Sequence, residues 1–294
     1  MTFMNDRLAD IVEARDPELL ATGFTKTEGP VWHPDGYLMF TDFPNHRIHR
    51  ILPDGRTEVI RENSGGTDGM TLDLQGRLVM CEYRNRCVTR MEHDGSITTI
   101  ADRWKGQRLN KPNDVVGRSD GTLYFTDCNP VSEEQGVDID HGVVYRVTPD
   151  GEVEVATLVV RYPNGIALSP DEDILYVSDS SYDMYILACD ILPDGSVTNE
   201  RVFANMTSNK DGKPDGMKVD VEGRVYCTGP GGTWVFEPSG GYVGTIRTPE
   251  IPLNVGWGGP DNRTMFFTTR DWRGEEASVY SIRMRTAGTR IPTD

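Results

Sequence analysis

One pattern of hydrophobic and polar positions recurs six times along the chain. Each copy begins with an acidic or amide residue, runs through two short apolar strands around a Pro, Asp or Gly turn, and ends with two more strands around a second turn. The period of roughly 40 to 50 residues and the short alternating strands are typical of propeller blades. The copies begin at Glu28, Asp68, Asn113, Asn164, Asp215 and Asn254. The sequence therefore predicts an all-β, six-bladed β-propeller of four-stranded blades.

The sixth copy shows only three strands after Asn254. The segment 19–24, ahead of the first copy, is expected to supply the missing strand and to close the ring without an open edge. We predict one domain over residues 1–294, with a short N-terminal helical segment at about residues 6–14. The long acidic insertion at residues 128–141 is expected to form a loop over one face.

The six starting residues are candidates for chemistry because equivalent positions of innermost strands point to one level of the central channel. None of the six is basic, and ionised carboxylates only accept hydrogen bonds, so the group would repel itself without a cation. Oxygen-only donors favour hard ions, Ca²⁺ first, with Mg²⁺ or Mn²⁺ and also Zn²⁺ or Fe²⁺ left open. A structural ion or an ordered water column is the alternative interpretation.

Composition narrows the possible partners. Lys and Arg total 30 against 46 Asp and Glu, and the net charge of -16 disfavours nucleic acid and anionic membrane surfaces. Five scattered cysteines without a CxxC pair argue against a disulfide framework and a thiolate metal site. The N-terminal segment holds no apolar stretch typical of a signal sequence, so a reduced, cytoplasmic protein is expected.

The segments EGPVWHP, NKPNDVV, YPNGIALSPD and PDGMKVD resemble motifs of the senescence marker protein, gluconolactonase and regucalcin-like family, and the resemblance runs from about Leu19 to Met284. It implies a divalent metal bound by Glu28, Asn164 and Asp215, with Asn113 on the metal or on the substrate. It also implies hydrolysis of sugar lactones, with relatives that act on other esters and organophosphates. The Cys81-Glu82 stretch is similar to the bacterial lactonases of the family.

One position departs from the family pattern: several members carry Arg where this chain has Lys111. Lysine keeps the charge but loses the planar fork of arginine, which leaves the identity of the substrate open. The candidate substrate-binding residues are Lys111, Asn113, Asp68 and Asn254.

The leading hypothesis is a metal-dependent sugar lactonase that converts an aldonolactone to an aldonic acid. Asp215 is the candidate general base and Asp68 the second choice, while Lys111 would steady the oxyanion or a substrate hydroxyl. The alternatives are a hydrolase of other lactones, aryl esters or phosphotriesters, and a metal-binding propeller without catalysis. A monomer or weak homo-oligomer is expected.

Overall fold

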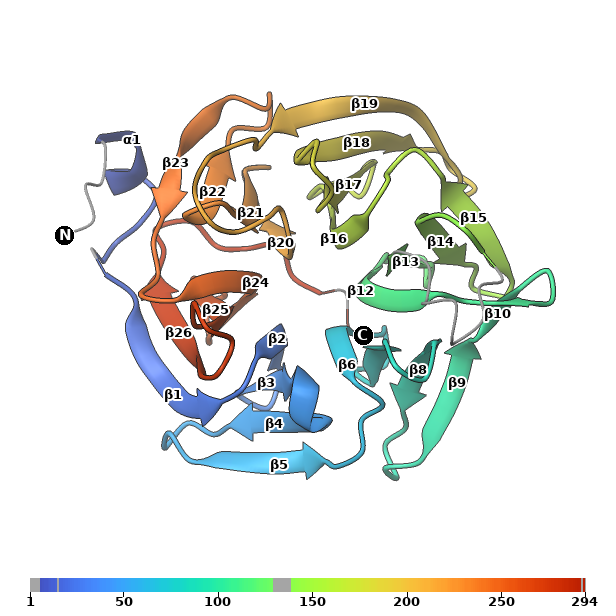
Figure 1. The fold of residues 1–294 in the computed structure, drawn as a ribbon, viewed down its shortest axis with the longest axis horizontal. Helices are drawn as coiled ribbons and strands as arrows, with labels where there is room; N and C mark the ends of the chain where they lie inside the picture. The colour runs from blue at the N-terminus through green and yellow to red at the C-terminus, as the bar shows by residue number, and fades with distance from the viewer. Residues whose placement is uncertain (1–5, 15, 129–138, 292, 294) are drawn as a thin grey trace.

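The computed structural model describes residues 6–14, 16–128, 139–291 and 293. Over these residues the strands form six four-stranded sheets around a central axis, together with one two-stranded hairpin (Figure 1). The prediction of an all-β propeller with six four-stranded blades is confirmed. No helix in these ranges is long and apolar enough to span a bilayer.

The first three blades follow one another in chain order, each with its first strand innermost. Blade 1 contains β2 (Thr27–His33), β3 (Tyr37–Asp42), the short helix η1 (Phe43–Asn45), β4 (Arg47–Ile51) and β5 (Thr57–Arg61). Blade 2 contains β6 (Thr67–Leu72), β7 (Leu78–Glu82), β8 (Cys87–Met91) and β9 (Ile97–Ala101). The hairpin β10 (Arg103–Trp104) and β11 (Gln107–Arg108) then leads to blade 3, which contains β12 (Lys111–Gly117), β13 (Leu123–Cys128), β14 (Val143–Val147) and β15 (Val153–Thr157).

The last three blades repeat this order until the ring closes. Blade 4 contains β16 (Pro163–Leu168), β17 (Ile174–Asp179), β18 (Tyr185–Ile191) and β19 (Val197–Asn205). Blade 5 contains β20 (Met217–Val219), β21 (Val225–Gly229), β22 (Gly232–Phe236) and β23 (Tyr242–Ile246). Blade 6 contains β24 (Ile251–Gly258), β25 (Thr264–Arg270), β26 (Ala277–Arg283) and, outermost, β1 (Glu18–Phe24).

Ring closure by the N-terminal strand is confirmed. β1 pairs antiparallel with β26, from Glu18 opposite Ser281 to Phe24 opposite Ala277. The first and last parts of the chain are therefore joined in one sheet by backbone hydrogen bonds, and β1 covers the edge of β26.

The N-terminal helix is shorter than predicted: α1 spans Asp6–Ala9. The prediction to residue 14 is wrong because the following backbone pairs with the end of blade 6. The Glu13 N–H donates to the Arg283 carbonyl at 2.9 Å, and Val12 forms a bridge with Met284. Most of the predicted loop insertion, residues 129–138, lies outside the described residues.

The core lies between neighbouring blades. Val31 and Met39 of blade 1, for example, pack in one buried cluster with Met70 and Leu78 of blade 2. Burial of apolar side chains at these contacts is the main stabilising term of the fold. The innermost strand β6 is buried along its whole length, whereas the outermost strand β9 is largely exposed. Each blade therefore presents one protected edge to the axis.

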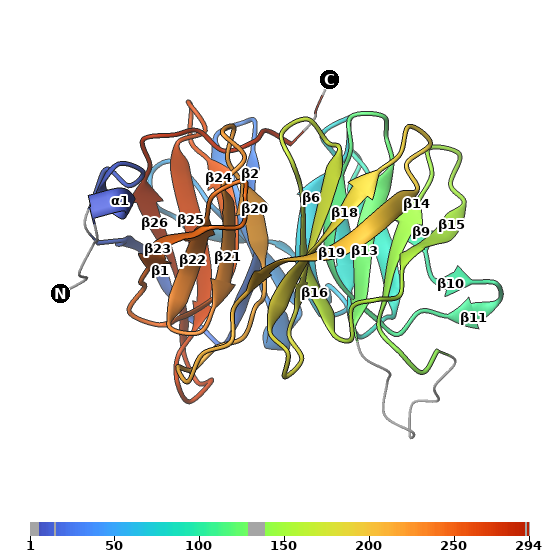
Figure 2. The same cartoon turned by 90° about the horizontal axis from the view of Figure 1, so that it is seen from above.

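The inner strands all run in the same direction along the axis. In side view, the hairpin β10–β11 projects at the end where these strands begin, and residues 284–291 cross the opposite end (Figure 2). Residues at the start of the inner strands therefore surround one mouth of the central channel.

Candidate functional site

Strand pairing defines equivalent positions at the start of the inner strands. In five blades one residue near the start of the inner strand pairs with the last or the second-last residue of the second strand, as Thr27 pairs with Asp42 and Pro163 with Asp179. The next residue is here called the ring position. In blade 5, Ser178 donates to the Asp215 carbonyl at 2.9 Å, which assigns Asp215 to it. The ring positions are Glu28, Asp68, Asn113, Asn164, Asp215 and Leu253.

Asn254 is not at the ring position, so its predicted equivalence to the other five residues is wrong. Thr228 donates to the Leu253 carbonyl at 2.8 Å, as Ser178 does to Asp215. Pro252 pairs with Thr269, as Pro163 pairs with Asp179 in blade 4. Asn254 therefore corresponds to the residue after the ring position, and blade 6 contributes the apolar Leu253 to the ring.

Three carboxyl groups lie in the ring. Glu28 and Asp68 are 2% and 5% exposed, and Asp215 is half-buried. Burial raises the pKa of Asp68 and of Asp215 well above the ordinary value of 3.8, and the neighbouring Glu28 charge raises both further. The Glu28 pKa is also raised, by burial and by Asp114, although Lys26 opposes this. These carboxylates carry unfavourable electrostatic energy that a bound cation would relieve.

The two carboxamides of the ring are held by their nitrogen atoms. Asn113 Nδ2 donates to Asp68 Oδ2 at 3.0 Å, and Asn164 Nδ2 donates to Ser180 Oγ at 2.9 Å. Ser180 in turn donates to the Pro214 carbonyl. Because each amide nitrogen is bonded to Asp68 or Ser180, the amide oxygen on the other side of the same group is left as an acceptor. Such outer contacts orient metal ligands in proteins.

A second layer, here called the floor, lies one residue further along the inner strands. Asp114 and Asn254 come from blades 3 and 6, and Asn254 Nδ2 lies 3.5 Å from Asp114 Oδ2. Glycine at the neighbouring floor positions makes room for them, since a Cβ on Gly69 would lie 2.2 Å from Asp114 Oδ1 and one on Gly216 would lie 2.0 Å from Asn254 Oδ1. Both side chains are buried, and burial raises the pKa of Asp114. The sequence shows this layer only as an Asp where four other copies have Gly.

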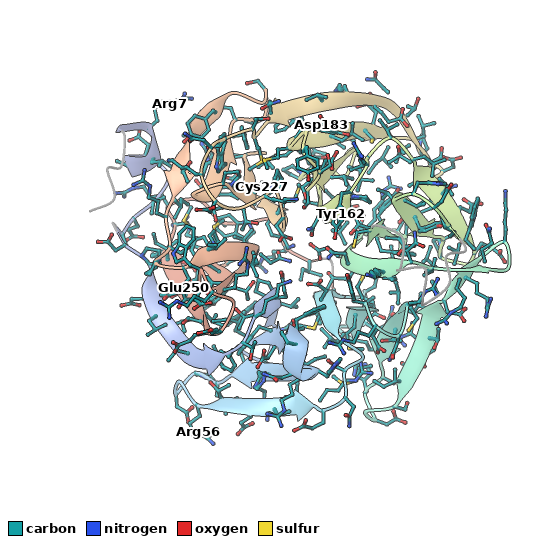
Figure 3. All side chains as sticks on the ribbon, viewed as in Figure 1. Arg7, Arg56, Tyr162, Asp183, Cys227 and Glu250 are labelled. Carbon is teal, nitrogen blue, oxygen red and sulfur yellow. The ribbon has the colours of Figure 1, made fainter. Side chains whose placement is uncertain are left out.

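A third layer, here called the rim, lies two residues before the ring. In blades 1, 3 and 4 its positions are fixed by acidic residues at the ends of the second strands. Asp42 accepts the Lys26 N–H at 3.4 Å, and Asp127 accepts the Lys111 N–H at 2.5 Å. Burial raises the pKa of Asp127 to about 7, although the backbone N–H groups of Asn110 and Lys111 that donate to it oppose this. In Figure 3 the rim residue Tyr162 is labelled near the centre of the ring of blades.

Lys26 is a site residue that the sequence analysis missed. Its Nζ lies 3.4 Å from Glu28 Oε1 and 4.7 Å from the centroid of Phe43. Burial alone would lower the Lys26 pKa, but the charges of Asp68, Glu28 and Asp215 outweigh burial and raise it. An ammonium group therefore already accompanies the ring carboxylates, which shows that this position attracts cations. Its place two residues before Glu28 matches Lys111 two before Asn113.

The donor set fits a hard divalent ion. Glu28, Asn113, Asn164 and Asp215 offer only oxygen, and two of the four are charged, which would neutralise a dication. Within the described ranges, no group of three or more His, Cys, Asp and Glu side chains is arranged to hold a metal. A site here would depend on the two carboxamides as much as on the carboxylates.

A cavity lies at the other end of the channel. It has a volume of about 350 Å³ and is lined by the later residues of the inner strands, such as Val116 and Leu168, and by Thr289 and Ile291. None of the ring or rim residues lines it. The ring and the rim are therefore separate from this cavity and lie towards the mouth where the inner strands begin.

The fold and the site together define a six-bladed propeller with an acid and amide centre at one channel mouth. The family model described as "SMP-30/Gluconolactonase/LRE-like region" matches residues 26–271. A gluconolactonase of Zymomonas mobilis is 28% identical over 317 residues, covering 98% of this chain and 87% of that protein. A pentonolactonase of Haloferax volcanii is 27% identical over 256 residues, covering 84% of this chain and 82% of that protein.

A solved structure agrees with these sequence matches. A gluconolactonase of Xanthomonas campestris is 30% identical, with a TM-score of 0.85, and the match covers 96% of this chain and 93% of that chain. The chain belongs to the SMP-30/gluconolactonase/regucalcin family, as its sequence motifs predicted.

Proposed function

We propose that this protein hydrolyses a sugar lactone to the corresponding aldonic acid, with one divalent metal ion held by Glu28, Asn113, Asn164 and Asp215. The observation that carries the proposal is the orientation of the two carboxamides, whose nitrogens bond to Asp68 and Ser180. This arrangement leaves two amide oxygens and two carboxylates as donors at one level. Ca²⁺ is the first candidate because all the donors are hard oxygens. Membership of the family and the similarity to lactonases support the reaction class.

A bound dication would polarise the lactone carbonyl and lower the pKa of water. We assign the general base to Asp215, which is only half-buried and can accept a proton from water entering through the mouth. Asp68 is less suited to that role because its Oδ2 accepts the Asn113 amide. Asp68 is therefore proposed to position Asn113, and Lys111 to steady the developing oxyanion or a substrate hydroxyl.

The test is acid release from a panel of γ- and δ-lactones of six-carbon and five-carbon sugars. The pentonolactonase among the relatives is the reason to include the five-carbon compounds. We expect turnover of at least one lactone, its loss after complete metal removal, and its return with added divalent ion. Equal rates in the metal-free and metal-loaded protein would contradict the metal-dependent mechanism, and a lack of turnover with every metal and lactone would contradict the reaction.

A further inference from the structure

Lysine occupies the rim position in every second blade. The rim lysines are Lys26 in blade 1, Lys111 in blade 3 and Lys213 in blade 5, each two residues before its ring residue. The chain as a whole carries a net charge of -16, so this gathering of cations at one mouth runs against the overall charge.

Each rim lysine lies over an aromatic ring. Lys26 Nζ is 4.7 Å from the centroid of Phe43, and Lys111 Nζ is 4.9 Å from that of Tyr83. Phe43 and Tyr83 also contact each other edge to face at 5.4 Å, so the lysines of blades 1 and 3 belong to one continuous cluster. Contacts of this kind stabilise a lysine in a defined region while leaving its N–H donors available.

The third lysine lies further out. Lys213 is exposed, and its Nζ is 5.6 Å from the centroid of Tyr182, a side chain that is 86% exposed. Lys26 and Lys111 are half-buried. In the described part of the chain, no acidic side chain forms an ion pair with Lys111 or Lys213, whereas Lys26 pairs with Glu28. The rim thus offers ammonium groups at two depths. Among the described residues, Lys111 and Lys213 have no acidic side chain that neutralises their charge.

A neutral sugar does not require this arrangement. A lysine ammonium is a compact, strongly hydrated charge whose strongest hydrogen bonds go to anionic oxygens. The carboxylates of the ring are already served by Lys26 and, in the proposed function, by the metal ion. Charge on the substrate is the remaining partner that suits Lys111 and Lys213.

We propose that the rim lysines bind an anionic substituent of the substrate, so that the preferred substrate is a sugar lactone carrying a carboxylate, phosphate or sulfonate group away from its ring carbonyl. This inference rests on the proposed lactonase function and adds the class of lactone. The lactone carbonyl would lie at the ring, and the anionic group would lie at the rim between blades 1, 3 and 5.

The experiment compares gluconolactone with two anionic relatives, its phosphate ester at the primary hydroxyl and the monolactone of glucaric acid, at saturating metal. The variants are Lys111→Gln and Lys213→Gln, because Lys26 pairs with Glu28 of the ring. The matched control is Lys105→Gln, which also removes an exposed lysine that lies over an aromatic ring, Trp104 at 4.7 Å, but on the outlying β10–β11 hairpin. The two anionic substrates distinguish a phosphate site from a carboxylate site.

We expect the unmodified protein to favour an anionic lactone over the neutral one by about tenfold or more in kcat/KM, since charge-assisted hydrogen bonds carry effects of that size. Each rim variant should reduce this ratio by about tenfold, and Lys105→Gln should leave it unchanged. An unchanged ratio in both rim variants would overturn the proposal even if lactones are hydrolysed.

A binding measurement separates this inference from the lactonase proposal. Calorimetric titration with gluconate, with its phosphate ester and with glucarate requires no turnover. Tighter binding of the phosphate ester or of glucarate than of gluconate, lost in Lys111→Gln and Lys213→Gln, supports the anion site even if no lactone is opened. Equal binding of the three acids overturns it, whatever the enzyme activity.

Discussion

At the scale of single residues, an offset of one or two positions along the inner strands separates three kinds of chemistry. Lys26 lies at the rim, Glu28 at the ring, and the floor begins one residue later. The Asn113-Asp114 pair shows the same division, because Asn113 bonds to Asp68 in the ring whereas Asp114 lies near Asn254 in the floor. Neighbouring residues of one strand therefore serve different parts of the site.

Asp215→Asn tests the proposed base directly. The variant keeps the shape of the side chain but cannot accept a proton at neutral pH, so we expect kcat to fall by a factor of roughly 10² to 10⁴. Initial rates of acid release at saturating metal measure the effect, and circular dichroism verifies that the propeller remains folded. Turnover close to that of the unmodified protein would rule out Asp215 as the base.

Ser180→Ala tests whether the Ser180 hydroxyl orients the Asn164 amide. The variant removes the acceptor of Asn164 Nδ2, and we expect the metal dissociation constant to rise by about 10- to 100-fold with kcat at saturating metal little changed. Ser181→Ala is the matched control, because Ser181 accepts the Asp183 N–H and does not contact a ring residue in the described contacts. Metal titration followed by activity and by calorimetry gives both constants, and equal metal affinity in the two variants would contradict the orienting role.

At the scale of the strand, the sequence predicts the six repeats correctly, but it does not predict the strand register in every blade. Short apolar strands and turns such as Pro53-Asp54-Gly55 predicted the blades, since Gly55 supplies the positive φ that this turn requires. In the sixth copy the polar residue Asn254 suggests the ring position. The structure instead places Pro252 of blade 6 at the position of Pro163 of blade 4, so that Leu253 is at the ring. Periodicity alone cannot distinguish the two alignments, because the first strand pair of blades 1 to 4 and of blade 6 contains a register shift, which changes which neighbouring residue takes a given position.

The rest of the site could not be predicted for a related reason. The role of Lys26 depends on its proximity to Glu28, Asp68 and Asp215, which come from blades far apart in the sequence. Ser180 acts through the Asn164 amide, a contact that no motif reports. The ring residues can be predicted from the sequence because they recur in the repeat, whereas Lys26 and Ser180 act through contacts that the repeat does not show.

Gly216→Ala tests the packing of the floor. A Cβ at this position would lie 2.0 Å from Asn254 Oδ1 and 2.7 Å from Asn254 Cα, so we expect the free energy of unfolding to fall by about 1 to 3 kcal/mol. Gly117→Ala is the matched control in the inner strand of blade 3, where a Cβ would meet Leu123 Cδ2 at 3.5 Å, an ordinary contact. Urea unfolding measures both, and equal stability of the two variants would show that the floor is loosely packed.

At the scale of the whole molecule, the ring carboxylates link stability to pH and to metal. In the metal-free protein the pKa values of Glu28, Asp68 and Asp215 are raised above their ordinary values. Between the ordinary and the raised values, the folded state holds protons that the unfolded chain has released. The free energy of unfolding therefore falls as pH rises through this window. Exposed groups such as Asp261, whose pKa is lowered by Arg283, act in the opposite sense but at lower pH.

A divalent ion should cancel this slope, because it replaces the protons as the charge that balances the carboxylates. With a chelator present, we expect Tm to fall as pH rises above the ordinary carboxyl pKa of about 4. With metal at about a hundred times its dissociation constant, the protein should gain about 2.7 kcal/mol, most visibly at the higher pH. Glu28→Gln is expected to weaken metal binding and so to reduce this gain. Thermal unfolding across the pH series with chelator and with Ca²⁺ measures both effects. Curves of Tm against pH that coincide under the two conditions would contradict a metal ion bound at the ring.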